Sequence, residues 1–378
     1  MSATTLRVVL DGAGAETPHG VGRYTIELTR ELIATAPRGC SVTGFVPSSP
    51  EADYDRIEAA LPGLASLAKS ALDRRQLAAA WQHGFSRLPG TGMVHAPSLL
   101  APLYRHDPVN NPGEQFVVTM HDAVAWTHPE TLAGRRVSRV KAMARRAERY
   151  ADAIVVPTHA VADELASVLD LGERVRVIGG APSTTLDPGP SIDSRSTAMG
   201  LPERFVIAVG PLDRRSGIID LVWAMAETHA PDVPLVLVGV TADELAELVQ
   251  TAHLDEGRVI ALGDLDDTDL AVAYARASVA VVPSIATGFG LPAIEAMSLG
   301  TPVVHSEAPA LLEVCADAGL VVERESPATY PERLAAAVQR VLDDGALADE
   351  LSVRGRDRAG VYSWRDSAEK VWQLHADL

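Results

Sequence analysis

The chain has 378 residues, of which 47% are hydrophobic and 22% are charged, a composition typical of a folded protein that is too long for one ordinary core. Its formal net charge of -17 argues against a general nucleic-acid-binding protein, because neutralising phosphates requires an excess of Lys and Arg on the binding face. The two cysteines, Cys40 and Cys315, are far apart, so the sequence predicts neither a disulfide framework nor a zinc site and favours a reducing compartment.

The chain begins MSATTLRVVLDG, which passes directly into a strand-like pattern, so we predict no signal peptide. No stretch approaches the roughly 20 apolar residues that a membrane-spanning helix needs. We expect a cytoplasmic protein, and a peripheral contact with the inner face of the membrane stays open.

The first half of the chain alternates short β-branched runs with helix-like stretches, such as residues 23–35 and 133–152. Alternation of this kind predicts a doubly wound α/β domain with a parallel sheet. The strand-like runs are 6–11, 41–46, 92–96, 116–122, 153–157 and 174–179.

The second half repeats the alternation, and residues 181–203 between the halves are dense in Pro, Ser, Thr and Gly. Its strand-like runs are 205–210, 234–240, 258–263, 277–284, 302–306 and 319–323. The pattern predicts two Rossmann-like domains facing a cleft, where the C-terminal ends of the strands converge and ligands bind. The expected parts are an N-terminal domain over 1–185, a linker over 186–202, a C-terminal domain over 203–360, and a helix over 361–378 that packs on the N-terminal domain.

Residues 286–304, ATGFGLPAIEAMSLGTPVV, connect two of the expected strands. Pro292 near the first helical position and Gly300 past the last apolar residue predict a helix between them. Free N–H groups at the start of such a helix form an anion site, and Gly288 and Gly290 let a ligand approach the backbone. The alternative is that Gly and Pro only shape a tight turn.

Several motifs, weak singly, are specific in their order and spacing. They are GVGRYTIEL (20–28), HD (121–122) after VVTM, IVVPTHAVADEL (154–165), VGPLDRRSGI (209–218), residues 286–304, and YSWRDSAEKV (362–371). The chain resembles the retaining GT-B glycosyltransferases of family 4, particularly the branch that builds bacterial surface polysaccharides from mannose-like sugars. The resemblance implies a nucleotide-sugar donor bound mainly by the C-terminal domain, a glycan or lipid-linked acceptor bound by the N-terminal domain, and transfer with retention of configuration.

The resemblance also assigns a set of donor-binding residues. Backbone N–H groups at the start of the helix would meet the diphosphate, and Glu295 would accept two hydrogen bonds from the ribose diol. The alternative for Glu295 is a solvated helix position, which its apolar neighbours disfavour. The expected donor-binding residues are Gly22, Gly210, Arg214, Arg215, Ser216, Thr287, Gly288, Phe289, Gly290, Leu291 and Glu295.

In the N-terminal domain the resemblance places Gly20 and Arg23 at the acceptor and His121 beside the transferred sugar, as the catalytic residue. The alternatives are a plain strand-to-helix turn at the glycines and a structural His bonded to backbone. We expect Asp122 to cap or orient the following loop, and His95 and His305 to be structural.

Two positions depart from the family pattern. A Glu is usual at Thr287, where it holds donor-sugar hydroxyls, and a Lys is usual at Ser216, where it neutralises the leaving diphosphate. Arg214 or Arg215 can take the cationic role. The sequence therefore leaves open an active hexosyltransferase and a non-catalytic nucleotide-sugar-binding partner of another transferase. A sugar-nucleotide epimerase of the same fold would need acid-base carboxylates that we do not identify.

No metal and no other cofactor is expected, because the acidic run 262–270 has the pattern of a loop and a helix cap rather than that of a metal site. Residues 135–150 place seven cations on one expected helix. This helix either faces anionic lipid or a lipid-diphosphate acceptor, or is simply solvated.

Overall fold

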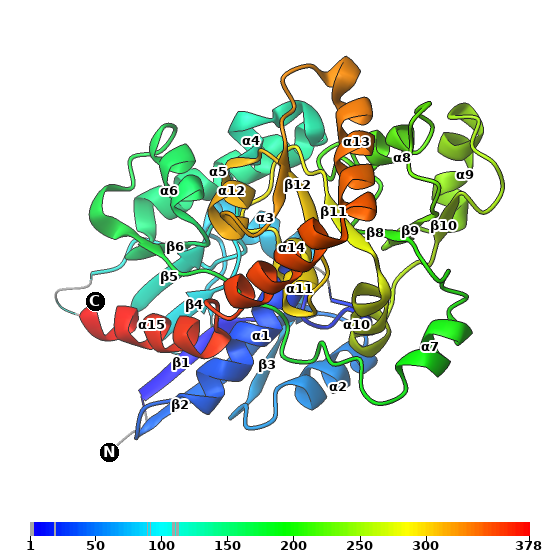
Figure 1. Ribbon diagram of the computed structural model, residues 1–378. Coiled ribbons are helices and arrows are strands. Elements are labelled where there is room, and N and C mark those ends of the chain that lie inside the picture. Colours follow the sequence, from blue (N-terminus) through cyan, green and yellow to red (C-terminus); the bar gives the residue numbers. More distant parts are fainter. Residues whose placement is uncertain (1–3, 19, 89, 91, 108–109, 111–112) are drawn as a thin grey trace. The chain divides into compact units, whose positions relative to one another are not determined.

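The computed structural model describes residues 4–18, 20–88, 90, 92–107, 110 and 113–378. The chain divides into two compact units (Figure 1): unit 1 is Met1–Gly180 with Ser363–Leu378, and unit 2 is Ala181–Tyr362. Each unit contains one parallel sheet with helices packed around it, which confirms the predicted fold class of two doubly wound α/β domains.

The sheet of unit 1 has the strand order β3-β2-β1-β4-β5-β6-β7, and every described pairing is parallel. The central strands β4, β5 and β6 are buried along their whole length, as expected where helices cover both faces. The strands are β1 (Thr4–Val9), β2 (Cys40–Ser48), β3 (Leu67–Asp73), β4 (Met93–Ala96), β5 (Gln115–Thr119), β6 (Ala153–Val156) and β7 (Val175–Val177).

Strand β3 was missed by the sequence prediction. It is the edge strand, it includes the polar residues Lys69, Ser70 and Asp73, and it is exposed at alternate positions. An edge strand with one solvated face lacks the continuous apolar run that revealed the central strands.

The helices of unit 1 include the last helix of the chain. Helix α15 packs along α1, where Trp372 Nε1 donates to the Leu32 carbonyl at 3.1 Å and Trp364 makes an edge-on contact with Tyr24. The helices are α1 (Val21–Ala34), α2 (Glu51–Ala60), α3 (Arg74–His83), α4 (Val124–Thr127), α5 (Gly134–Tyr150), α6 (His159–Ala166) and α15 (Trp364–Asp377), with short 3₁₀ turns at Pro129–Thr131 and Gly172–Arg174.

The sheet of unit 2 has the order β10-β9-β8-β11-β12-β13, again with parallel pairings. The strands are β8 (Val206–Val209), β9 (Leu235–Val238), β10 (Val259–Ala261), β11 (Val279–Val282), β12 (Val303–Ser306) and β13 (Leu320–Val322). The helices are α7 (Ile192–Ala198), α8 (Ile218–Ala224), α9 (Ala242–Thr251), α10 (Asp267–Arg276), α11 (Leu291–Ser298), α12 (Pro309–Cys315), α13 (Tyr330–Asp343) and α14 (Gly345–Ala359), with a 3₁₀ turn at Pro327–Thr329.

Residues 186–202, which the sequence predicts to be a linker, contain α7. This helix packs on α10, and Arg195 pairs with Asp269 at 2.6 Å. Its sequence is too polar to show a buried face, so only the contact with α10 reveals it as part of unit 2.

The strand order fixes where a ligand can bind in unit 2. From β8 the chain moves to β9 and β10 on one side, and then returns to β11 on the other side of β8. The loops that leave the C-terminal ends of β8 and β11 therefore lie at the point where the strand order reverses, which is where doubly wound sheets usually bind their ligands. Most of the predicted donor residues lie in these two loops.

Candidate active site

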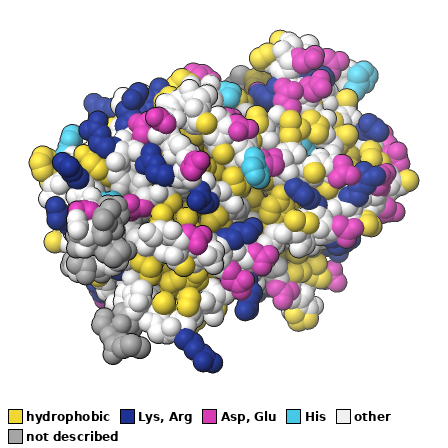
Figure 2. All heavy atoms as spheres, turned by 90° about the vertical axis from the view of Figure 1, so that its left-hand side faces the viewer, with side chains coloured by type: hydrophobic (Ala, Val, Ile, Leu, Met, Phe, Trp, Pro, Cys, Tyr) yellow, Lys and Arg dark blue, Asp and Glu magenta, His cyan; other side chains and the backbone are white. Residues whose placement is uncertain are grey.

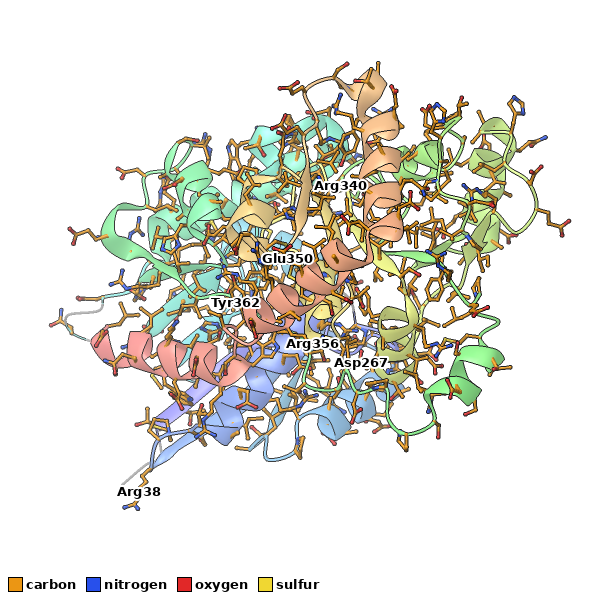
Figure 3. The ribbon with its side chains drawn as sticks, in the orientation of Figure 1. Arg38, Asp267, Arg340, Glu350, Arg356 and Tyr362 are labelled. Carbon is orange, nitrogen blue, oxygen red and sulfur yellow. The ribbon has the colours of Figure 1, made fainter. Side chains whose placement is uncertain are left out.

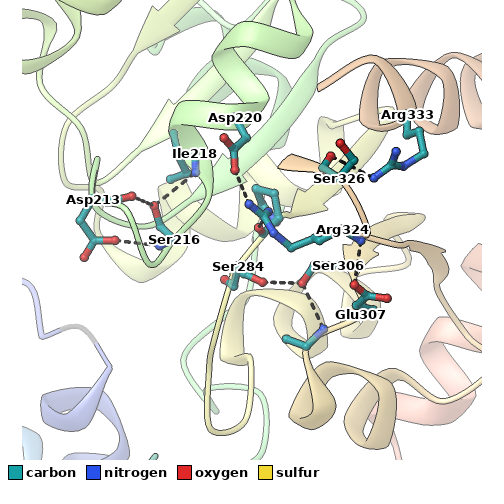
Figure 4. Close-up of polar contacts among 12 residues, drawn as sticks. Asp213, Ser216, Ile218, Asp220, Ser284, Ser306, Glu307, Arg324, Ser326 and Arg333 are labelled. Atoms are coloured by element: carbon teal, nitrogen blue, oxygen red, sulfur yellow. Dashed lines mark hydrogen bonds and ion pairs between the residues drawn. The ribbon is translucent and has the colours of Figure 1, made fainter. Parts of the chain in front are cut away.

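Ser216 closes the loop between β8 and α8 (Figure 4). Its backbone N–H donates to Asp213 Oδ1 at 2.7 Å, and its hydroxyl donates to the Asp213 carbonyl at 2.9 Å. The same hydroxyl accepts the N–H of Ile218 at 3.3 Å. At the position where the family usually has a Lys, this chain thus uses a serine to shape the start of α8.

Gly217 lets this loop approach the end of β11. The residue has φ 70°, in the left-handed region that favours glycine, and a Cβ there would lie 2.0 Å from the carbonyl oxygen of Pro283. Only glycine fits without moving one of the two loops.

The base of the β11–α11 loop is held by its neighbours. The N–H of Ile285 donates to the Arg215 carbonyl at 2.8 Å, and the Ser306 hydroxyl donates to the Ser284 carbonyl at 2.5 Å. The structure therefore brings the predicted residues 214–216 and 287–291 together as parts of adjoining loops.

Arg324 holds the same loop from the side of β13, and sequence reasoning missed it. Its guanidinium donates to the Pro283 carbonyl at 3.0 Å and pairs with Asp220 at 2.5 Å, as Figure 4 shows. It also lies 3.9 Å from the centre of the Tyr330 ring, and its backbone N–H donates to Glu307. Since 104 residues separate Arg324 from Asp220, no local pattern signals this contact.

Helix α11 starts as the sequence predicts, with Pro292 in its first turn and Gly290 as the N-cap residue. Gly290 has φ 82°, and a Cβ on it would lie 2.4 Å from Leu311 Cδ2. Phe289 turns its side chain into the core, where the centre of its ring lies 5.3 Å from that of Tyr362 and the two rings meet edge-on. Only its backbone is therefore available to a nucleotide-sugar donor. Leu291 begins the helix, and its N–H precedes the first hydrogen-bonded turn.

Glu295 is buried within α11, with 3% of its surface exposed. The alternative of a solvated helix position is therefore wrong. A carboxylate so placed between Ile294 and Ala296 requires a polar partner to offset the cost of its burial.

The other predicted donor residues of unit 2 differ in exposure. Arg214 is exposed, while Arg215, Thr287 and Gly288 are half-buried. Gly210 ends β8 beside Gly239 at the end of β9, where a Cβ on Gly239 would lie 3.2 Å from the Gly210 carbonyl oxygen.

Gly20, Gly22 and Arg23 lie at the start of α1 in unit 1. Gly20 is the N-cap residue with φ 49°, and a Cβ on Gly22 would lie 2.5 Å from the carbonyl oxygen of Gly12. Both glycines are thus required by the turn itself. Arg23 is buried, with 8% of its surface exposed.

His121 lies at the end of β5 on the same edge of the sheet. Its Nε2–H donates to the Pro97 carbonyl at 2.7 Å, and its ring stands edge-on to Tyr24 at 4.7 Å. Burial lowers the pKa of His121 below its ordinary value, so the ring is neutral near pH 7. Within the described residues Nδ1 has no hydrogen-bond partner, and it remains an acceptor for a hydroxyl. Asp122 accepts the N–H of Val124, as predicted for a capping residue.

His95 and His305 are both fully buried on strands, and His305 Nδ1 bonds the Ser306 carbonyl, in keeping with the predicted structural roles. A second group at the same edge as His121 was not predicted. Asp11 follows β1, is 2% exposed, and accepts Ser98 Oγ at 2.9 Å and Arg74 Nε at 2.6 Å.

No group of three or more His, Cys, Asp or Glu in the described part of the chain is arranged to hold a metal ion. Asp266 caps α10, as the sequence predicts for the acidic run. Over the same described residues, every helix is too short or too polar to cross a membrane.

Comparisons with known proteins agree with this architecture. Residues 18–181 match the description "Glycosyltransferase Family 4", and residues 203–344 match "Glycosyl transferases group 1". The O-antigen chain mannosyltransferase B of Escherichia coli is 28% identical over 92% of this chain and 93% of its own. The MMP alpha-(1->4)-mannosyltransferase of Mycolicibacterium hassiacum is 31% identical over 75% of this chain and 67% of its own.

Among solved structures, sucrose-phosphate synthase from Thermosynechococcus elongatus superposes with a TM-score of 0.75 at 24% identity, covering 99% of this chain and 98% of its own. Anabaena HepE, solved in complex with UDP and glucose, gives a TM-score of 0.74 at 17% identity, covering 99% of this chain and 100% of its own. Two parallel sheets with these strand orders, the two family descriptions that match the chain, and a relative that is 31% identical over 75% of it show that the protein belongs to the family 4 glycosyltransferases of GT-B fold.

Proposed function

We propose that the protein transfers a mannose-like hexose from a nucleotide sugar to a glycan or lipid-linked acceptor in surface polysaccharide synthesis, with retention of configuration. The observation that carries this proposal is the buried Glu295, which lies in α11 next to a glycine loop at the switch point of the sheet. The printed activities of the two mannosyltransferase relatives support the choice of sugar.

The donor diphosphate would bind at the start of α11, where the N–H groups of residues 289–291 and the helix dipole favour negative charge. Glu295, farther along the helix, would accept the two ribose hydroxyls. The guanidinium of Arg214 or Arg215 would neutralise the leaving diphosphate, since the Ser216 hydroxyl is used within its own loop.

His121 would act on the transferred sugar. Because Nε2–H is committed to the Pro97 carbonyl, the free lone pair on Nδ1 can accept a hydrogen bond from a sugar hydroxyl. This fixed tautomer supports a positioning and charge-stabilising role in the transition state rather than binding of the nucleotide.

The test of this proposal is ligand-induced stabilisation with a panel of nucleotide sugars, including mannose and glucose donors. A matching donor at ~100 times its dissociation constant should stabilise the protein by about 2.7 kcal/mol. Glu295→Gln, which keeps the shape but loses the charge, should erase most of this shift. Glu350→Gln on α14 (Figure 3), which removes an exposed carboxylate from the same unit, should leave it unchanged. Equal shifts in both variants would place the donor elsewhere.

We also propose that α5 gives the enzyme a peripheral contact with anionic membrane, where a lipid-linked acceptor would reside. Arg135, Arg136, Arg139, Arg145 and Arg149 are all exposed on this helix. On the face drawn in Figure 2, Lys and Arg side chains gather toward the upper left, despite the net charge of -17. Such a local excess of cations favours an anionic surface.

An exposed aromatic side chain supports this contact. Phe85 is 84% exposed and follows Gly84, where a Cβ would lie 2.3 Å from Arg146 Nη2 of α5. Co-sedimentation with phosphatidylglycerol vesicles should fall with added salt and in Arg135→Ala/Arg139→Ala. Absence of binding at low salt would contradict the contact.

A further inference from the structure

A cavity of about 500 Å³ lies in unit 1 at the edge of the sheet where β6 begins. Because the strands are parallel, this is the edge opposite to the one that carries Gly20 and His121. The proposed transfer reaction makes no use of it, and of its lining residues only Arg149 also belongs to the proposed membrane contact of α5. Its lining is Arg105, His106, Arg149, Tyr150, Ala151 and Asp152.

The buried part of the cavity wall is a His–Asp pair. His106 is only 6% exposed at its side chain, and its Nε2 lies 3.0 Å from both carboxylate oxygens of Asp152. Nδ1 lies 3.1 Å from the Tyr104 carbonyl oxygen, so both ring nitrogens lie within hydrogen-bond distance of oxygen atoms. Asp152 also accepts the N–H of Phe116 at 2.7 Å. The carboxylate therefore orients the His106 ring and also holds the Phe116 N–H.

Arg105 and Arg149 form the exposed rim of the cavity. Within the described part of the chain, neither guanidinium makes a hydrogen bond or an ion pair. This is notable in a chain with 50 acidic residues against 33 Lys and Arg, because acidic partners are abundant. The rim thus presents two cations beside the His106–Asp152 pair.

The C-terminal end of α5 does not cancel the positive charge of Arg105 and Arg149. The last carbonyls of a helix carry partial negative charge, which disfavours an anion. Here Arg174 Nη1 donates to the Ala151 carbonyl at 2.9 Å, so that carbonyl is already satisfied by a third cation.

We propose that this cavity binds a phosphate monoester. Two guanidinium groups match a dianion in charge, and each presents a planar pair of N–H donors that fits two phosphate oxygens. Tyr150, which also lines the cavity, carries a hydroxyl that can donate a further hydrogen bond to a phosphate oxygen. The ester is either a soluble sugar or nucleotide phosphate, or the headgroup of a lipid such as phosphatidic acid.

The direct test is calorimetric titration with inorganic phosphate at low ionic strength. Loss of two charge-assisted contacts in Arg105→Ala/Arg149→Ala should raise the dissociation constant at least about tenfold. The matched control is Arg38→Ala/Lys370→Ala, which removes the same charge from exposed sites of the same unit (Arg38 is marked in Figure 3) and should leave the constant unchanged. Any phosphate that binds at the donor site contributes equally to both double variants.

Arg105→Lys/Arg149→Lys separates charge from geometry, because Lys keeps the cation but loses the planar fork, and it should give an intermediate constant. The side chains replaced in these variants are all exposed, so the variants should have the same midpoint of thermal unfolding. They are Arg38, Arg105, Arg149 and Lys370. Identical titrations for the two alanine double variants, or no saturable phosphate binding in the parent, would overturn the proposal.

Vesicles identify the source of the phosphate. We compare phosphatidic acid, a monoester, with phosphatidylglycerol, a diester, at equal surface charge. A preference for phosphatidic acid that Arg105→Ala/Arg149→Ala abolishes assigns the site to a lipid headgroup. Phosphate binding without that preference assigns it to a soluble ester.

Discussion

Ser216 provides a direct test of the donor loop, because it occupies the position where family members usually have a Lys. Its hydroxyl donates to the Asp213 carbonyl at 2.9 Å and accepts the Ile218 N–H at 3.3 Å. Each such bond contributes roughly 0.5–1.5 kcal/mol net, so Ser216→Lys should lower the free energy of unfolding of unit 2 by about 1–3 kcal/mol. We expect no gain in turnover, because the added cation comes at the cost of the bonds that hold the start of α8.

Ser216→Ala is the matched control, since it loses the same two bonds without adding a cation. Trp223 on α8 is the single tryptophan of unit 2, so ¹⁹F NMR of 5-fluorotryptophan-labelled protein reports the unfolding of this unit separately in urea. Turnover is measured as release of nucleoside diphosphate with and without acceptor. A rise in turnover for Ser216→Lys with an unchanged urea midpoint would refute the reasoning.

Arg215→Ala completes this experiment. The loop contact uses the Arg215 carbonyl, which accepts the Ile285 N–H at 2.8 Å, so alanine preserves this contact while it removes the guanidinium. If that group neutralises the leaving diphosphate, turnover should fall on the order of a hundredfold. Full activity without it would show that the compensating cation lies elsewhere.

Three further predictions follow from the contacts described above. Arg324→Ala should raise the donor KM more than it lowers kcat, because it removes the hydrogen bond to the Pro283 carbonyl at the base of the β11–α11 loop. The control Arg333→Ala, which removes hydrogen bonds to the nearby Glu323 and Ser326 carbonyls, should leave the donor KM unchanged. Equal effects of the two variants would point to general destabilisation. His121→Ala should lower turnover far more than affinity for the bare nucleotide, and parallel losses would indicate a structural role. Burial lowers the pKa of His375 to about 3, so the folded protein binds fewer protons than the unfolded chain below the ordinary value of 6.5. Stability should then be greatest above that value and fall as the pH drops, by about 2 kcal/mol at pH 5, and His375→Gln should flatten this slope in urea titrations at several pH values.

Much of the fold could be predicted because its signals are local. Buried strands such as β5 and β11 appear as continuous apolar runs, and α11 is bounded by Pro292 and Gly300 within one short segment. The edge strand β3 and helix α7 could not be predicted, since half-exposed polar segments lack that signature.

The position of a loop glycine can be read from the sequence where the backbone conformation requires glycine. The sequence marks Gly290 as a loop glycine, and the structure supplies the reason, because a Cβ on it would collide with Leu311. The sequence analysis did not single out Gly217, where a Cβ would collide with the Pro283 carbonyl. The committed hydroxyl of Ser216 was not predicted, because its contacts depend on the path of the loop rather than on residue spacing.

The sequence by itself determined the alternation of strands and helices, the glycine loops at strand ends and the family to which they belong, since each depends on residues within a few turns of one another. Only the tertiary structure decided that Arg324 contacts Asp220 and the Pro283 carbonyl. It also decided that Asp152 holds His106 in a cavity lined by two arginines. Side chains that far apart in the chain leave no periodic signal, and they meet only because parallel strands bring their ends to the same edge of a sheet.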